Sequence, residues 1–286
     1  MPMIRSIIGL LPIWKERLAT KRLLKHLSES PNWGTFQSAY RRLHSTETAM
    51  TRVVNDLLTN VDCGKPSVLL SLDISAAFDT LDHDMLLQRS GELFGLSGRV
   101  NEWLRTYLSG RTAYVSLAGF HSAAADFPTG VPQGSVLGPL LLSIFTVPCG
   151  HLISTYNIPY HQYADDNQLY TVIDQSTSSD IQRLSDCAEV VLHSGLLLNR
   201  AKTEAMFTGT RQQVAKMDSV AGIGLAGAVI PFAKTVKDFG VSIDQHLTFD
   251  GHISKVVGSF HYHIRALRHI RRLIDRETAN TLACSI

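Results

Sequence analysis

Apolar residues recur every three or four positions in several stretches of the chain, and this spacing predicts amphipathic helices. One such helix is expected over residues 46–59, where the apolar face would consist of Met50, Val53, Val54, Leu57 and Leu58. Residues 98–109 show the same spacing, and Gly110 is expected to end that helix. Further helices are expected over residues 13–28, from about residue 84, and over residues 181–192.

Three short segments have the composition of β-strands instead. Residues 67–72 form a nearly continuous apolar run that ends at Asp73, which suits a strand buried on both faces with a carboxylate at its exposed end. Residues 158–163 and 167–172 are rich in aromatic and β-branched residues, so both are expected to be extended. Together they predict a β-hairpin with the adjacent acids Asp165 and Asp166 at its tip.

These acids indicate a metal site if the fold brings them together. Placing Asp73 within about 4 Å of Asp165 would cost on the order of 4 kcal/mol at an effective dielectric near 20, so a cation would be needed. Carboxylates without nearby His or Cys select Mg²⁺ or Mn²⁺ over zinc, and two such ions suit phosphoryl transfer. The alternative is ordinary turn chemistry, because aspartate is common in tight turns.

Three further segments accompany the acids in a particular order: Gln-Ser-Ala-Tyr-Arg at 37–41, Gly-Val-Pro-Gln-Gly-Ser-Val-Leu-Gly-Pro at 130–139, and Leu-Asn-Arg-Ala-Lys-Thr-Glu at 198–204. With residues 72–79 and the Tyr-Ala-Asp-Asp box at 163–166, they resemble the successive blocks of a reverse transcriptase. More narrowly, the chain resembles the polymerase of a non-LTR (LINE-type) retrotransposon from about residue 13 to its end.

The resemblance implies roles for individual residues. Asp73 and Asp165 match the two metal-binding aspartates, the backbone carbonyl of Ile74 matches an additional ligand, and Asp166 matches the second acid of the box. Because neighbouring side chains on a strand point opposite ways, Asp165 is expected to be the direct ligand and Asp166 to support it. Phe78 matches the aromatic gate that would exclude a 2′-hydroxyl, although such a ring can also be ordinary core.

Other matching residues would contact the nucleotide. The loop at 130–138 is rich in glycine and proline, which allows backbone to approach a ligand closely, and Gln133 and Gly134 are its expected nucleotide-binding residues. The apolar residues after the loop have helical spacing and should be core. Lys202 matches a lysine that would protonate the departing pyrophosphate. Arg41 matches an arginine that would pair with the triphosphate, and Arg42 is a possible substitute.

The implied fold class is α+β, a right-hand polymerase whose antiparallel palm sheet carries the catalytic aspartates. Fingers are expected over 1–65, and a thumb that stops early over 251–286. The palm is expected over 66–250, with a fingers insertion near 96–128 and a primer-grip-like hairpin near 230–245. The implied partners are an RNA template, a DNA primer and deoxynucleoside triphosphates, and the implied cofactor is two Mg²⁺ or Mn²⁺ ions.

Charge is distributed unevenly, although the net charge is only +2. Residues 1–65 carry ten Lys and Arg against five acids, and residues 255–276 carry six against one. Between them, residues 66–200 hold six against thirteen, which suits metals at the centre and phosphate backbone at the edges. The alternative for either basic flank is a solvated helix face.

Composition bounds the cellular setting. The four cysteines show no paired spacing, so we expect reduced thiols without a disulfide partner in an intracellular protein of the nucleus or cytoplasm, and no zinc site. The longest weakly polar stretch is expected at 219–233, and its fifteen residues are too few to cross a bilayer. No membrane partner is expected.

Competing readings remain at this point. The glycines of 222–227 fit the dinucleotide-binding fingerprint, but extended residues and Pro231 follow them, so a hairpin or loop is expected. Asp82 is expected to cap a helix, and His261 and His263, which lack partners at zinc spacing, to be surface or packing residues. The first family block, at 5–12, is degraded and no endonuclease region is present, so a catalytically inactive remnant that at most binds nucleic acid is the main alternative. An RNA-copying RNA polymerase would share the acids but not the aromatic Phe78.

Overall fold

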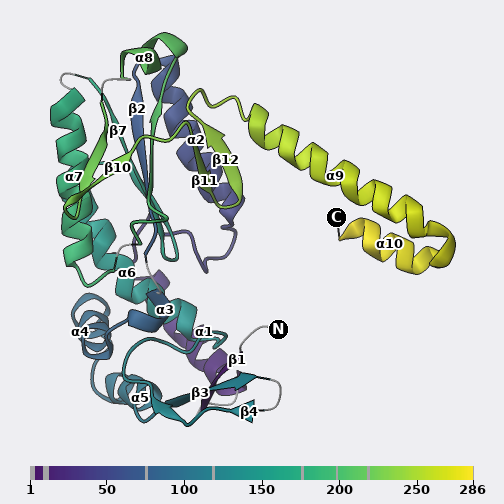
Figure 1. Cartoon of the computed structure of the whole chain (residues 1–286). Helices are drawn as coiled ribbons and strands as arrows, with labels where there is room; N and C mark the ends of the chain where they lie inside the picture. The colour runs from purple at the N-terminus through teal and green to yellow at the C-terminus, as the bar shows by residue number, and fades with distance from the viewer. Residues whose placement is uncertain are drawn as a thin grey trace.

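The centre of the fold is a four-stranded antiparallel sheet in the order β6 (Tyr160–Tyr163), β7 (Asp166–Val172), β2 (Ser67–Leu72) and β8 (Glu204–Thr208) (Figure 1). The structure is a computed structural model that describes residues 13–74, 77–117, 120–174, 177–197, 199–217 and 220–285, and the backbone of residues 4–8. The strand and the hairpin expected from the sequence are therefore confirmed, and they pair with each other as β2 and β7.

Strand β2 is buried on both faces because helices cover one face of the sheet and a helix with a hairpin covers the other. Val68, Leu70 and Leu72 pack into the core formed with α4 (His83–Phe94), α6 (Gly138–Thr155) and α7 (Thr177–His193). The alternate residue Leu69 faces α2 (Thr46–Asp62) and the hairpin of β11 (Thr235–Asp238) with β12 (Val241–Asp244). Two covered faces account for the nearly continuous apolar run of this strand.

Helix α6 is the most apolar segment of the fold. Its 18 residues are long and hydrophobic enough to span a membrane by length and composition alone, but 67% of the helix is buried within the protein. No other helix among the described residues passes that test. Its side chains Leu141, Ile144 and Phe145 are fully or almost fully buried, which confirms the expected core helix after the glycine-rich loop.

A second region of the fold lies beyond α6 and α4 (Figure 1). It contains α1 (Ile13–Ser28), α3 (Ala77–Thr80), α5 (Arg99–Leu108) and a sheet in which β3 (Thr112–Leu117) pairs with β1 (Ile4–Ile8), β4 (Phe120–His121) and β5 (Ala125–Asp126). The helix expected over 13–28 is confirmed with the same bounds, and the helix expected over 98–109 is confirmed one residue shorter at each end. Asp82 caps α4 by accepting a hydrogen bond from the amide of Met85 at 2.7 Å, as expected.

The glycines at 222–227 form a hairpin, as expected, and not a dinucleotide-binding turn. Strand β9 (Gly222–Leu225) pairs with β10 (Ala228–Pro231), and Ala226 and Gly227 form the connection between them. The short helix α8 (Arg211–Lys216) precedes this hairpin.

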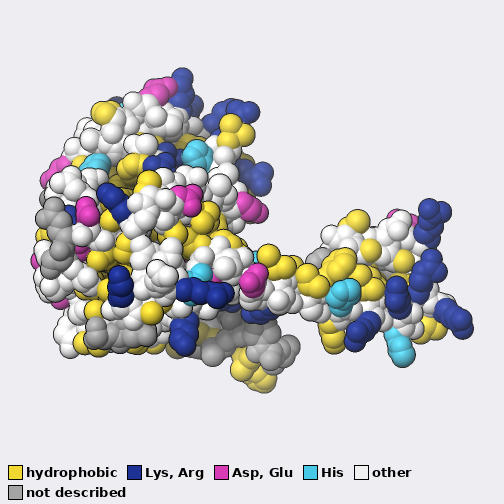
Figure 2. Space-filling view, turned by 90° about the horizontal axis from the view of Figure 1, so that it is seen from above, with side chains coloured by type: hydrophobic (Ala, Val, Ile, Leu, Met, Phe, Trp, Pro, Cys, Tyr) yellow, Lys and Arg dark blue, Asp and Glu magenta, His cyan; other side chains and the backbone are white. Residues whose placement is uncertain are grey.

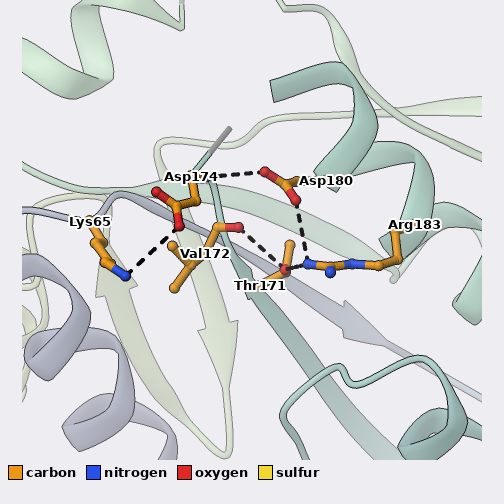
Figure 3. A network of polar contacts seen from close by, with 6 residues as sticks. All are labelled: Lys65, Thr171, Val172, Asp174, Asp180 and Arg183. Carbon is orange, nitrogen blue, oxygen red and sulfur yellow. Dashed lines mark hydrogen bonds and ion pairs between the residues drawn. The ribbon is translucent and has the colours of Figure 1, made fainter. Parts of the chain in front are cut away.

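One end of β7 is tied to the start of α7 by polar contacts (Figure 3). Arg183 donates to the hydroxyl of Thr171 at 2.9 Å and pairs with Asp180 at 3.4 Å. The other oxygen of Asp180 accepts from the amide of Asp174 at 3.1 Å, and Lys65 lies 3.9 Å from the Asp174 carboxylate. Ion pairs near the surface, such as these, contribute little stability.

The last elements form an arm that extends away from the body of the protein (Figures 1 and 2). It comprises α9 (Asp250–Ile270), a 3₁₀ turn (Arg271–Leu273) and α10 (Arg276–Cys284), none of which contains a buried residue. Figure 2 shows basic side chains along the arm beside an apolar strip. A hollow of about 700 Å³ lies between its two helices, far from the acids described below. His261 and His263 are exposed on α9, as expected.

Candidate active site

The tip of the β6–β7 hairpin is a tight acidic turn. Tyr163 pairs with Asp166 across the hairpin, which leaves Ala164 and Asp165 as the two turn residues. Ala164 has φ +57°, a left-handed conformation that costs a residue with a Cβ atom about 1–2 kcal/mol. Two backbone groups of Ala164 are held by the side chain of Gln37: its Oε1 accepts from the Ala164 amide at 3.1 Å, and its Nε2 donates to the Ala164 carbonyl at 3.4 Å.

Sheet register brings Asp73 to this turn. Leu72, the last residue of β2, is paired with Asn167, so Asp73, which follows β2, lies beside Asp166 on the neighbouring strand. The backbone of Asp73 is held from the other side, where its carbonyl accepts from the amide of Asn199 at 2.8 Å. The same loop places the Lys202 ammonium 3.9 Å from the Asp73 carboxylate. The structure thus brings together the three acids and the lysine that the sequence singled out.

The acids influence each other's ionisation. Burial raises the pKa of Asp166 to about 6, with further contributions from the charges of Asp165 and Asp73. Burial also raises the pKa of Asp165, and the charge of Asp73 acts in the same direction. Lys202 opposes both shifts, since a nearby cation favours the ionised carboxylate. The centre therefore has an excess of negative charge that one lysine offsets only in part.

The donor set fits a hard divalent cation. Within the described part of the chain, no three His, Cys, Asp or Glu side chains converge tightly enough to hold a metal ion by themselves. Magnesium sites commonly use only one or two carboxylates and take their remaining ligands from water and substrate phosphates. The raised pKa values of Asp165 and Asp166 match that chemistry, because a bound cation would offset both the burial of these carboxylates and their repulsion.

A hollow of about 380 Å³ opens next to Asp165. Phe78, Gln133 and Gly134 line it, so three of the predicted nucleotide-binding residues share one wall with a predicted metal ligand. Gln133 donates from Nε2 to the carboxylate of Asp79 at 3.2 Å, which fixes the amide at the rim. Phe78 is half-buried, so its ring is part of both the core and the hollow.

The glycines of this loop differ in what they provide. A Cβ atom on Gly130 would lie 2.7 Å from the Cα of Asp79, so this glycine is needed for close approach of the loop to another stretch of backbone. The amide of Val131 donates to the carbonyl of Phe78 at 2.6 Å across the same contact. Gly134 has the same φ of +82° but nothing within 4 Å of an added Cβ, and it alone of the two faces the hollow. Close approach to a ligand therefore stays a prediction for Gly134, whereas Gly130 allows close contact with the backbone of Phe78 and Asp79.

One predicted nucleotide-binding residue lies away from the acids. The structure does not bring Arg41 to the acids: its guanidinium donates to the carbonyl of Gly34 at 2.5 Å and lies over the ring of Trp33. The reason is the φ of +60° at Tyr40, which turns the chain so that Tyr40 faces Asp165. Burial raises the pKa of the Tyr40 phenol, and the charge of Asp165 adds to this effect.

Ile74 follows Asp73 directly and its side chain is buried. The role of its carbonyl as a metal ligand stays a prediction. Residues 75–76 and 198 of the matching blocks lie outside the described residues.

The sequence interpretation missed a fourth carboxyl near the turn. Asp238 ends β11 and is 4% exposed, and Gln168 of β7 donates to its Oδ1 at 3.1 Å. Burial raises the pKa of Asp238 to about 7, and the charge of Asp166 adds to this effect. The next residue, Phe239, packs edge-to-face on Tyr163 with ring centroids 5.2 Å apart. Within β11, Val236 and Asp238 are buried while Thr235 and Lys237 are exposed, an alternation that only the packed structure shows.

A second residue that the sequence interpretation missed, Glu16, supports the glycine-rich loop that precedes α6. Glu16 of α1 is 2% exposed, and its carboxylate accepts from the hydroxyl of Tyr107 at 3.2 Å and from the amide of Val136 at 2.7 Å. It thereby connects α1 to the loop that carries Gln133 and Gly134. Glu16 lies in the first turn of α1 between two exposed basic residues, and nothing in the sequence indicated this role.

Comparison with known proteins places this geometry in a family context. The family model described as reverse transcriptase (RNA-dependent DNA polymerase) matches residues 4–243. The "RNA-directed DNA polymerase from mobile element jockey" of Drosophila melanogaster is 29% identical over 252 residues, which cover 86% of this chain and 27% of that protein. The "Probable RNA-directed DNA polymerase from transposon BS" of the same species is 28% identical over 289 residues, covering 98% of this chain and 31% of that protein. The chain thus spans about a quarter to a third of the length of these relatives.

Solved structures show a similar fold at low sequence identity. Telomerase from Candida tropicalis in complex with a fragment of telomeric RNA superposes with a TM-score of 0.56 at 15% identity, over 82% of this chain and 36% of that one. The apo form of the same enzyme gives a TM-score of 0.54 at 14% identity, over 84% of this chain and 40% of that one.

Proposed function

The chain belongs to the reverse transcriptase family, and we propose on that basis that it is an RNA-directed DNA polymerase, adding deoxynucleotides to a primer 3′-hydroxyl under the direction of an RNA template. The fold is the expected α+β right-hand polymerase fold, and the relatives are non-LTR retrotransposon polymerases. The observation that carries the proposal is the charge interaction of Asp73 and Asp165 with Asp166 at the hairpin turn, where Asp165 lines the hollow shared with Phe78 and Gln133.

The acid turn, formed by Ala164 and Asp165 at the tip of the β6–β7 hairpin, is the proposed cation site. Reverse transcriptases use divalent metal ions, and the carboxylates of Asp73, Asp165 and Asp166 with the carbonyl of Ile74 would hold two Mg²⁺ or Mn²⁺ ions in this chain. Bound there, the ions would activate the attacking hydroxyl and stabilise the leaving phosphate oxygen. The carboxylates of neighbouring strands β2 and β7 hold their relative positions because the sheet register fixes them.

Other residues would bind and orient the nucleotide. Phe78 would lie beneath the sugar, where a ring held by the Gly130 contact would clash with a 2′-hydroxyl. Gln133 and Gly134, which line the same hollow, would contact the nucleotide or the template. Lys202, which lies next to Asp73, would donate a proton to the departing pyrophosphate.

The proposed partners are an RNA template, a DNA primer and deoxynucleoside triphosphates. Basic side chains gather at the two ends of the chain and along the α9–α10 arm, where phosphate backbone would be attracted (Figure 2). The proposed setting is the nucleus or cytoplasm.

A primer-extension assay tests the proposal. The purified protein would be given an RNA template, a DNA primer and deoxynucleotides with Mg²⁺, and wild type would be compared with Asp73→Asn and Asp165→Asn. Both variants should lose incorporation, while Asp186→Asn, an exposed acid on α7, should retain it. Equal incorporation by all four proteins would reject the mechanism. Salt-sensitive RNA binding by a wild type that extends no primer would favour the alternative of an inactive nucleic-acid-binding remnant.

A further inference from the structure

The acid turn is held by side-chain amides and not by its own backbone bonds alone. Gln37 is 2% exposed, and besides its two bonds to Ala164 its Oε1 accepts from the amide of Ala39 at 2.9 Å. An amide group offers two donors and two acceptor lone pairs, so three of the four are used on backbone. The Gln37 side chain is therefore itself held in position by the Ala39 amide, in addition to its bonds to the turn.

The other turn residue has a matching support. Asn167 donates from Nδ2 to the carbonyl of Asp165 at 3.0 Å. The Oδ1 of Asn167 in turn accepts from Nε2 of Gln162 at 2.6 Å, and both side chains are buried. Each of the two turn residues is thus bonded to a different buried amide, Ala164 to Gln37 and Asp165 to Asn167.

The segment that carries Gln37 is itself bonded to the sheet. Its backbone lies alongside β6, where the amide of Gln162 donates to the carbonyl of Phe36 at 2.9 Å and the amide of Ser38 donates to the carbonyl of Gln162 at 2.9 Å. The ring of Phe36 packs edge-to-face on Tyr160 of β6 with centroids 5.1 Å apart. Residues 36–38 therefore act as a short parallel extension of the sheet edge.

We propose that Gln37 is a positioning residue of the polymerase centre, which holds Ala164 in its left-handed conformation and so presents the Asp165 carboxylate to the divalent cation. This role rests on the proposed function of the acid turn. Neutral amides suit the task because they supply both donors and acceptors without adding charge beside carboxylates that already repel each other. Residues that orient metal ligands typically change metal affinity or activity by about 10–100-fold when they are replaced.

The test uses Gln37→Met, which keeps the length of the side chain and removes both bonds to Ala164. Mn²⁺ binding would be measured by electron paramagnetic resonance, and exchange of the Ala164 amide hydrogen by NMR. The variant should bind Mn²⁺ about 10–100-fold more weakly and lose protection at Ala164. Gln37→Glu, which keeps the acceptor for the Ala164 amide, should retain that protection and bind Mn²⁺ no more weakly than wild type.

Asn101→Leu is the matched control. Its amide also bonds two backbone carbonyls, those of Leu87 and Leu96, but at the start of α5, away from the acids. It should lower the unfolding midpoint without changing Mn²⁺ affinity. If Gln37→Met binds Mn²⁺ as tightly as wild type, or no more weakly than Asn101→Leu, the role of Gln37 is refuted while the proposed function stands. A wild type that neither binds Mn²⁺ nor extends a primer would refute the proposed function and this role together.

Discussion

Asp238→Asn should make the protein more stable at alkaline pH. The carboxyl of Asp238 is 4% exposed, and no described residue donates a hydrogen bond to its Oδ2. Burial raises its pKa from 3.8 to about 7, with the charge of Asp166 as the next contribution. An asparagine has nearly the same shape, carries no charge, and could donate to Gln168 Oε1, which also lacks a partner among the described residues.

The sign and size of the effect follow from the two ionisation constants. The unfolded chain releases this proton near pH 3.8 and the folded protein near pH 7, so folding is favoured by the proton. That stability is fully present below pH 3.8 and is lost as the pH rises through 7. A tenfold change in an equilibrium constant is about 1.4 kcal/mol, so the full difference corresponds to at most about 4 kcal/mol.

Urea unfolding at pH 4, 6 and 8 measures this difference. Asp238→Asn should match wild type in free energy of unfolding at pH 4 and exceed it by up to about 4 kcal/mol at pH 8. Asp186→Asn, on the exposed face of α7, should follow the wild-type pH profile. Parallel pH profiles for wild type and Asp238→Asn would show that the carboxyl is not held protonated by burial, and the reasoning would fail.

Four other substitutions test the loop and the gate. Gly134→Ala should cost about 1–2 kcal/mol of stability for its left-handed backbone, whereas Gly130→Ala, which also clashes with backbone, should cost about 2–5 kcal/mol; similar unfolding midpoints would contradict the close contact. Glu16→Ala should lower the free energy of unfolding by about 1–3 kcal/mol because the amide of Val136 loses its acceptor, and no loss would show that this bond is dispensable. Phe78→Val should raise incorporation of ribonucleotides relative to deoxynucleotides in primer extension, and unchanged sugar preference would remove Phe78 from the gate.

The parts of the fold that the sequence predicts well are those set by local periodicity. The strand that ends before Asp73 reads as an apolar run because both of its faces are covered by other elements. The two strands around the acid turn differ in composition from the turn itself. Such patterns repeat every two or three to four residues, so they can be read without knowing which segments meet. Their order along the chain then carried the family resemblance.

The supports of the site could not be predicted in that way because they join distant segments. Gln37 and Ala164 are 127 residues apart, and Gln168 and Asp238 are 70 apart. Neither Gln37 nor Asp238 differs by type from a solvated polar residue, and only the packed sheet shows that each is buried. Arg41 illustrates the opposite problem, since a motif match placed it by position while the turn at Tyr40 directs its side chain to Gly34 and Trp33.

The most direct test of the acid turn as a cation site is a Mn²⁺ titration followed by electron paramagnetic resonance on wild type, Asp73→Asn and Asp165→Asn. Carboxylates from β2 and from the β6–β7 turn should bind the ion jointly, so each substitution alone should weaken binding, and Mg²⁺ should displace Mn²⁺ from wild type. Asp186→Asn should bind as wild type does. Unchanged Mn²⁺ affinity in both Asp73→Asn and Asp165→Asn would contradict the account.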